Sequence, residues 1–237
     1  MSITTTGASS QRLNFGNILG GYTHKLYLIW VNRADNLRGT LFGKFNDPYT
    51  QGWAASIESS TGYKVFFGNK FSGTDGLWYA DFALSTGVQH YAIDYDNSST
   101  SNVPRIFVNN SSKSITAITS PTGSNDEGTG SVTVGDEITA DTNYGINGDY
   151  LSVAIMNVSG FSTAQIDLLI ADAYNSKKAT PGGPLIFCPQ LWGAAGGVSD
   201  GSTLAAGNTI ACQVSGALGV PSGSPVLRSD TVLTFQS

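Results

Sequence analysis

Positive charge is scarce in this chain of 237 residues. It holds 12 Lys and Arg against 17 Asp and Glu, a formal net charge of -5, and the basic residues form no cluster. Proteins that bind nucleic acid or an anionic membrane need such a cluster to neutralise phosphates, so we expect neither partner. No run approaches the roughly 20 apolar residues of a membrane span. The first residues lack a basic stretch followed by an apolar one, so no secretory signal is predicted.

Cysteine is also rare, which excludes a scaffold built on disulfides. The two cysteines are Cys188 and Cys212. They can pair in a disulfide or lie as two small buried hydrophobic residues. The sequence favours the second reading without deciding between them.

Residues that carry catalysis are few. The three glutamates, Glu58, Glu127 and Glu137, stand at none of the short spacings that place two carboxylates on one face of a strand for glycoside hydrolysis. We read Glu127 as a solvated loop carboxylate. His24 and His90 fall inside expected strands without a partner at ligand spacing, which indicates structural roles. The sequence therefore predicts no catalytic residue and no enzyme.

Small, turn-forming residues are abundant: 29 Gly, 28 Ser and 23 Thr, which indicate a turn-rich β protein. The segment 22–32 is apolar on both faces of a strand, which is typical of a strand packed on both sides. Further strands are expected about every ten residues. They span 40–45, 52–58, 63–67, 77–84, 88–95, 105–108, 114–118, 131–134 and 150–157. This spacing predicts an antiparallel sandwich or jelly roll.

One helix is expected after the strands. Ser162 and Gln165 form a capping box, and the apolar residues that follow recur on one face of a helix. These residues are Ile166, Leu169, Ile170, Ala173 and Tyr174. Thr-Pro-Gly-Gly-Pro at 180–184 ends the helix. We expect a sandwich domain over 15–178 and a C-terminal arm or small β subdomain over 181–237.

The arm is rich in Gly and Ser but too apolar for a disordered tail. Its apolar side chains need cover, either by folding back on the sandwich as extra strands or by docking on a neighbouring subunit. We expect docking, which a repeating assembly would strengthen. The residues expected to carry this assembly are Phe187, Leu191, Trp192, Val226, Leu227, Leu233 and Phe235.

Six segments, read in order, resemble one known family. They are Tyr-Leu-Ile-Trp-Val (27–31), Gly-Thr-Leu-Phe-Gly-Lys-Phe (39–45), Gly-Trp-Ala-Ala-Ser-Ile (52–57), the Gly-x-x-His-x-x-x-x-Tyr-Asp strand at 87–96, Ile-Phe-Val-Asn (106–109), and the closing strand and capped helix at 149–166. Together they resemble the laminin G-like members of the concanavalin A-like lectin and glucanase superfamily. The resemblance implies an all-β antiparallel jelly-roll sandwich with one short helix. Such folds host enzymes, lectins and structural modules alike.

Four aromatic residues near expected loops are candidates for binding carbohydrate. Trp53, Trp78, Tyr79 and Tyr49 have flat rings that can stack on sugars. Trp and Tyr in a sandwich are also ordinary core residues, and that alternative stays open.

Three polar residues at a strand end are candidates for a calcium site. Asp94, Asp96 and Asn97 offer the hard oxygen atoms that calcium prefers. Some laminin G-like domains bind calcium at a loop rim, so the resemblance implies calcium as the one candidate cofactor. A strand-to-turn transition without metal uses the same residues.

These observations lead to two functional hypotheses. The first is a non-enzymatic structural protein on the surface of a bacteriophage-like virus particle, such as a capsid decoration or fibre component. A lectin-type sandwich without an export signal could reach the outside by cell lysis. It would be made in the host cytoplasm and contact other virion subunits, further copies of itself and surface glycans. The alternative is a free carbohydrate-binding lectin.

Overall fold

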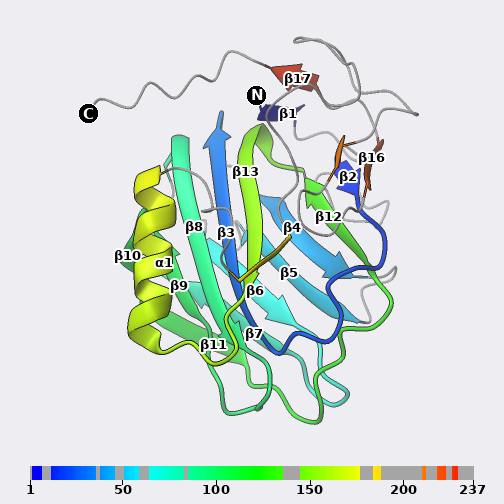
Figure 1. Cartoon of the computed structure of the whole chain (residues 1–237), viewed down its shortest axis with the longest axis vertical. Helices are drawn as coiled ribbons and strands as arrows, with labels where there is room; N and C mark the ends of the chain where they lie inside the picture. The colour runs from blue at the N-terminus through cyan, green and yellow to red at the C-terminus, as the bar shows by residue number, and fades with distance from the viewer. Residues whose placement is uncertain are drawn as a thin grey trace.

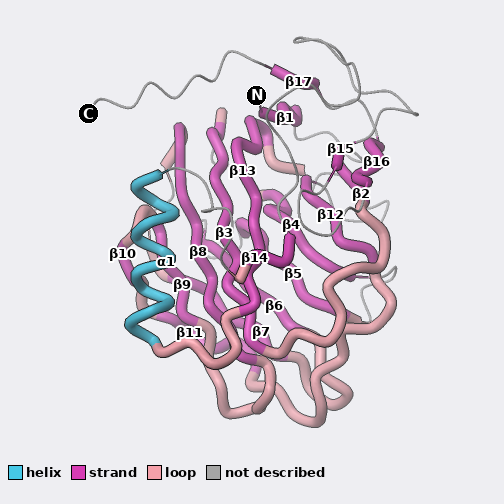
Figure 2. Tube along the Cα trace, in the orientation of Figure 1, coloured by secondary structure: helices cyan, strands magenta, loops and turns pink. Residues whose placement is uncertain are grey.

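The computed structural model describes residues 2–6, 12–35, 38–45, 51–58, 64–82, 85–135, 145–176, 184–187, 210–211, 218–222 and 226–228. They form two antiparallel sheets packed face to face, with one helix outside the first sheet (Figure 1, Figure 2). The predicted all-β antiparallel jelly-roll sandwich with one short helix is confirmed. Among these residues no helix is long and apolar enough to cross a membrane.

The first sheet is built around three long strands. β3 (His24–Arg33) pairs along its length with β8 (Gly87–Asp96) on one side and β13 (Asn147–Asn157) on the other. From β8 the order continues to β9 (Arg105–Val108) and β10 (Ser111–Ser112). From β13 it continues to β1 (Ser2–Thr6) and β17 (Val226–Arg228), and β14 (Leu185–Phe187) also pairs with β13.

The second sheet holds four consecutive strands at its centre. These strands follow one another in the chain and pair in the same order, so short connections fix their register. The full order is β11 (Ile115–Thr119), β7 (Gly76–Ala80), β6 (Lys64–Asn69), β5 (Gly52–Glu58), β4 (Gly39–Phe45), β12 (Ser131–Gly135), β2 (Arg12–Asn14), β16 (Leu218–Ser222) and β15 (Ile210–Ala211).

Alternation along β3 supplies two separate cores. Tyr27, Ile29 and Val31 enter the core between the two sheets. The residues between them, Leu28 and Trp30 among others, enter a second core between the first sheet and α1 (Thr163–Ser176). The prediction that segment 22–32 is packed on both sides is confirmed.

The capping box forms as predicted. The backbone N–H of Gln165 donates to Ser162 Oγ at 3.3 Å, and the backbone N–H of Ser162 donates to Gln165 Oε1 at 2.9 Å. These bonds satisfy amide groups that a helix start otherwise leaves unpaired. Ile166, Ile170 and Ala173 then bury the apolar side of α1 against the first sheet.

The described C-terminal segments fold back on the sandwich. β14 lies along β13, β16 along β2, and β17 along β1, where the backbone register pairs Leu227 with Ile3 and Val226 with Thr4. These strands pair with the sandwich, as in the first of the two alternatives, and docking on a neighbouring subunit stays a prediction. Backbone hydrogen bonds to free sheet edges cover the segments, and a side-chain pattern does not reveal such bonds. Leu191, Trp192, Leu233, Phe235 and both cysteines lie outside the described residues.

Candidate functional site

Two of the predicted sugar-binding aromatics are core residues. Trp53 and Trp78 are 0% and 1% exposed, and their rings pack on Tyr27 at 4.7 Å and on Tyr95 at 5.1 Å. A ring without accessible surface cannot stack on a sugar, so the expectation for these two is wrong. They occupy inward-pointing positions of β5 and β7, and periodicity alone does not say which side of a strand faces in.

Tyr79 lies on the opposite, outer face of β7 and is half-buried. Its ring packs 5.6 Å from the Phe66 ring, and the Lys64 ammonium lies 4.0 Å from its centre. Tyr79 is therefore placed where a ligand can reach it. Tyr49 lies outside the described residues.

The predicted calcium ligands do not converge. Asp94 Oδ1 pairs with His24 Nε2 at 2.8 Å, and Asp94 Oδ2 accepts from Arg105 Nε at 2.8 Å. Asp96 Oδ1 accepts the backbone N–H of Ser98 at 2.9 Å in a turn, whereas Asn97 is directed to Glu127. The described residues hold no group of three His, Cys, Asp or Glu side chains that could bind a metal ion. Both carboxylate oxygens of Asp94 are already paired, with His24 and Arg105, so this structure gives the calcium site no support, and calcium binding by Asp94, Asp96 and Asn97 stays a prediction.

His90 has a structural role, as the sequence indicated, and its ring packs on aromatic side chains. Its ring is buried, stacks on Trp30 at 4.4 Å and lies 5.7 Å from the Tyr174 ring of α1. Neither ring nitrogen has a hydrogen-bond partner among the described residues. Burial lowers the pKa of His90 to about 3. The imidazole is therefore neutral and inaccessible, which suits neither a base nor a metal ligand.

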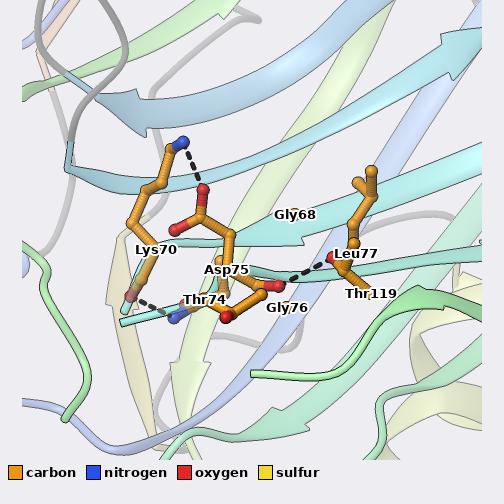
Figure 3. Close-up of a pocket in the computed structure, with 8 residues that line it drawn as sticks. Gly68, Lys70, Thr74, Asp75, Gly76, Leu77 and Thr119 are labelled. Atoms are coloured by element: carbon orange, nitrogen blue, oxygen red, sulfur yellow. Dashed lines mark hydrogen bonds and ion pairs between the residues drawn. The ribbon is translucent and has the colours of Figure 1, made fainter. Parts of the chain in front are cut away.

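A hollow of about 290 Å³ opens where β6 ends and β7 begins (Figure 3). We call it the β6–β7 hollow. It is lined by Gly68, Asn69, Lys70, Thr74, Asp75, Gly76, Leu77 and Thr119. Its lining combines apolar surface with a lysine and an aspartate, so we take it as the candidate site.

Register explains why the hollow is open. Thr119 on β11, Leu77 on β7, Gly68 on β6 and Ala54 on β5 stand opposite one another across four neighbouring strands. Gly68 has no side chain and Ala54 only a methyl group, so the outer face is low beside Leu77. Inside the sheet, a Cβ on Gly76 would lie 2.0 Å from the Trp78 ring. Only glycine lets that ring pack against the strand beneath the hollow.

An ion pair stands at the rim of the hollow. Lys70 Nζ lies 2.6 Å from Asp75 Oδ2, and Asp75 Oδ1 accepts the backbone N–H of Phe71 at 3.3 Å. On the other side, the Thr119 hydroxyl donates to the backbone oxygen of Asp75 at 2.7 Å (Figure 3). The Asp75 side chain keeps 39% of its surface exposed and Lys70 17%. The rim thus offers charged and hydroxyl groups in fixed positions to a ligand.

The segment 119–127 contributes Thr119 to the lining of the hollow and is fastened to the turn 70–75. The backbone N–H of Thr122 donates to the Thr74 oxygen at 2.9 Å, and Thr122 Oγ1 accepts from the Thr74 N–H at 2.8 Å. Asn69 Nδ2 donates to Asn125 Oδ1 at 2.8 Å. These bonds hold the two loops as one unit.

The same segment is anchored inside the sandwich by a buried ion pair. Glu127 reaches between the sheets to the Lys25 ammonium, and their side chains are 11% and 1% exposed. Asn97 Nδ2 lies 3.4 Å from the same carboxylate oxygen. Burial lowers the pKa of Lys25, and the neighbouring Glu127 carboxylate opposes part of that shift. The expectation that Glu127 is a solvated loop residue is wrong, because Lys25 on the inner face of β3 draws the carboxylate inward.

Sequence reasoning missed Lys70, Asp75 and Thr119. Lys70 and Asp75 stand among Ser, Gly and Thr in an ordinary turn, and Thr119 lies 44 positions beyond Asp75. A Lys and an Asp flanking a short Gly-containing turn are a weak signal, since solvated turns use the same residues. Only the register of β7 with β11 brings the three together.

Comparison with solved structures shows the same fold in proteins of low sequence identity. A proposed carbohydrate-binding protein from Bacteroides ovatus superposes with a TM-score of 0.62 at 15% identity, over 97% of this chain. This chain spans 60% of that protein's length. Domains LG4-5 of the mouse laminin α1 chain superpose with a TM-score of 0.53 at 7% identity, over 66% of this chain and 42% of theirs.

A third similar structure carries a ligand. It is the CBM40 domain of the Ruminococcus gnavus IT-sialidase bound to α2,3 sialyllactose, with a TM-score of 0.52 at 11% identity, over 71% of this chain and 95% of that domain. No family model and no curated protein sequence matches this chain. The similarity at these identities establishes a jelly-roll, lectin-like fold.

Proposed function

We propose that this protein is a non-catalytic carbohydrate-binding module and that the β6–β7 hollow is its binding site. The observation that carries the proposal is the Lys70–Asp75 ion pair at the rim of an apolar hollow. The lectin-like fold of the neighbouring structures supports it.

The lining suits the surface chemistry of a sugar. A pyranose ring presents C–H groups on its faces, which pack on an apolar side chain such as Leu77, and hydroxyls on its edge. The Lys70 ammonium can donate to a hydroxyl oxygen while Asp75 accepts from the hydroxyl hydrogen. The hydroxyl of Thr119 stands on the far side of the same hollow. Both parts of the ligand therefore find complementary groups.

The outer face beside the hollow can accept a second sugar unit. On the outer face of the sheet, the next cross-strand pair along β7 and β6 is Tyr79 with Phe66, two positions beyond Leu77 and Gly68. Tyr79 is half-buried, so part of the residue is accessible. Aromatic rings at this place favour an oligosaccharide that extends from the hollow across the sheet.

A non-catalytic role follows from the carboxylates at the site. Among the eight lining residues Asp75 is the single carboxylate. Glycoside hydrolysis ordinarily uses a pair of carboxyl groups flanking the scissile bond. The hollow therefore binds without cleaving.

Two matched variants test the site. Lys70→Met removes the ammonium and keeps the stem, and we expect about tenfold weaker binding on a glycan array and in titration calorimetry, since hydrogen bonds to charged groups contribute about 1.5–3 kcal/mol. Lys113→Met removes an ammonium that donates to Ser111 Oγ at 3.1 Å, just after β10 in the first sheet. This control should bind as the wild type does. Equal losses in both variants, or no saturable binding by the wild type, would reject the proposal.

The virus-surface setting stays a separate prediction. It includes contacts with other virion subunits and with further copies of the chain, and it is compatible with a carbohydrate-binding module. Mass spectrometry of purified particles tests it. If the chain is missing from the particles, the free lectin becomes the better description.

A further inference from the structure

The charges of the β6–β7 hollow bear on which saccharides it takes. Lys70 and Asp75 are the two charged residues in its lining. Their side chains meet at 2.6 Å, so the single positive charge is already matched by a negative one. A pocket that selects acidic sugars needs a surplus cation, usually an Arg that binds a carboxylate with two hydrogen bonds. The lining of the hollow contains neither a surplus cation nor an Arg.

Asp75 is held in its place, and this makes the charge balance a fixed property of the site. Its Oδ1 accepts the Phe71 N–H at 3.3 Å, and its backbone oxygen accepts from Thr119 at 2.7 Å. Both contacts come from groups that the loops 70–75 and 119–127 fix. An incoming carboxylate would have to displace Asp75 from Lys70 while these bonds hold it.

Exposure makes Asp75 the charge that a ligand meets first. The Asp75 side chain is 39% exposed, against 17% for Lys70. Close approach of two like charges is unfavourable and is a common way for a surface to reject the wrong partner. A hydroxyl, in contrast, can donate to Asp75 and accept from Lys70 at once.

Resting on the proposed function, we infer that the β6–β7 hollow selects neutral saccharides and that Asp75 is the residue that excludes acidic ones. The ion pair acts as a hydroxyl-recognition group, and its negative member faces the solvent. Uronic acids and sialic acids are therefore poor ligands, whereas the same sugars with an esterified carboxyl group are acceptable.

The test compares acids with their own methyl esters, so that size and shape stay constant. The probes are sialyllactose and its methyl ester, and oligogalacturonate and its methyl ester, with lactose as a neutral reference. For at least one pair, the wild type should bind the ester about tenfold more tightly than the acid at low ionic strength, and this ratio should shrink in 1 M salt, where charges are screened.

Two variants assign the selectivity to Asp75. Asp75→Asn keeps an oxygen that can accept the Phe71 N–H, but it leaves the Lys70 charge without its negative partner. The affinity for the acid should therefore rise at least tenfold relative to the affinity for its ester. The double variant Lys70→Met with Asp75→Asn removes both charges and should bind acid and ester alike. Circular dichroism shows whether each variant is folded. If neither variant folds, the ratio of the wild-type affinities for acid and ester still tests the inference.

The outcomes separate this inference from the proposed function. Wild-type binding with a preference for the acid overturns the inference and leaves the carbohydrate-binding function standing. An acid-to-ester ratio that is unchanged in a folded Asp75→Asn variant also overturns the role of Asp75. Absence of saturable binding to every neutral and acidic probe overturns both.

Discussion

The outer face of the first sheet lies under α1, whereas the outer face of the second sheet keeps half-buried side chains along β5 and β7. On the first sheet, Leu28 and Trp30 are sealed against Ile170. On the second, Tyr79 and Leu77 remain within reach of solvent beside the β6–β7 hollow. The helix adds a second core on the first sheet, whereas the outer face of the second sheet has no helix over it, and that is where we propose that ligands bind.

The largest effect is expected at the buried anchor, the Lys25–Glu127 ion pair. Glu127→Ala leaves the Lys25 charge buried without its partner, which should cost about 3–5 kcal/mol of unfolding free energy. Urea denaturation measures the loss. The variant should also bind glycans weakly, because segment 119–127 carries Thr119 into the hollow and holds the turn 70–75 in place.

The control for the anchor is the double variant Lys25→Met with Glu127→Leu. Replacing both charges by apolar groups removes the unpaired charge, so this protein should be more stable than Glu127→Ala alone. If the double variant is the less stable of the two, the pair does not act as a buried anchor.

The covered face should respond to acid through His90. Burial lowers the pKa of His90 to about 3, below the roughly 6.5 of an unfolded chain, so the unfolded chain takes up the proton first. The contribution of His90 is fully present above about pH 6.5 and is lost as the pH falls toward 3, with about 3 kcal/mol of it lost between pH 6.5 and 4. His90→Phe keeps a ring against Trp30 and should flatten this dependence in urea titrations between pH 4 and about 7. An equal slope in both proteins would contradict the assignment.

Removing contacts from α1 should weaken the covered face without touching the open one. Ile170→Ala deletes a fully buried side chain and should cost about 3 kcal/mol. Leu168→Ala on the same helix changes a side chain that is 70% exposed and should stay within about 0.5 kcal/mol of the wild type. Thermal denaturation compares the two. Glycan binding should be the same in both, and a loss of binding in Ile170→Ala would break the separation of the two faces.

The smallest effect is expected on the open face itself. Tyr79→Ala removes a half-buried ring and should weaken binding of longer oligosaccharides about fivefold, near 1 kcal/mol, with little change for a monosaccharide. Calorimetry with a length series measures this. A uniform loss for every length would place Tyr79 in the hollow itself rather than beside it.

The sequence predicted the fold well where periodicity was strong. Segment 22–32 and the capped helix at 162–174 are where their patterns place them, since apolar alternation and capping are local properties. β7 ends at Ala80, earlier than the predicted 77–84, and β1 was not predicted because its residues are mostly Ser and Thr. The candidate site was harder to predict, because the alternation of residues along a strand does not say whether a Trp points into the core or toward solvent. Trp53 and Trp78 point in.

By itself, the sequence determined an antiparallel β protein with one capped helix and a low charge. These properties depend on composition and on the spacing of neighbouring residues. Tertiary structure decided which partners distant residues meet: Lys25 with Glu127, 102 positions apart, and Asp75 with Thr119, 44 positions apart. Strand register sets those meetings, and register depends on how two sheets bury their faces together, which no local pattern of residues specifies.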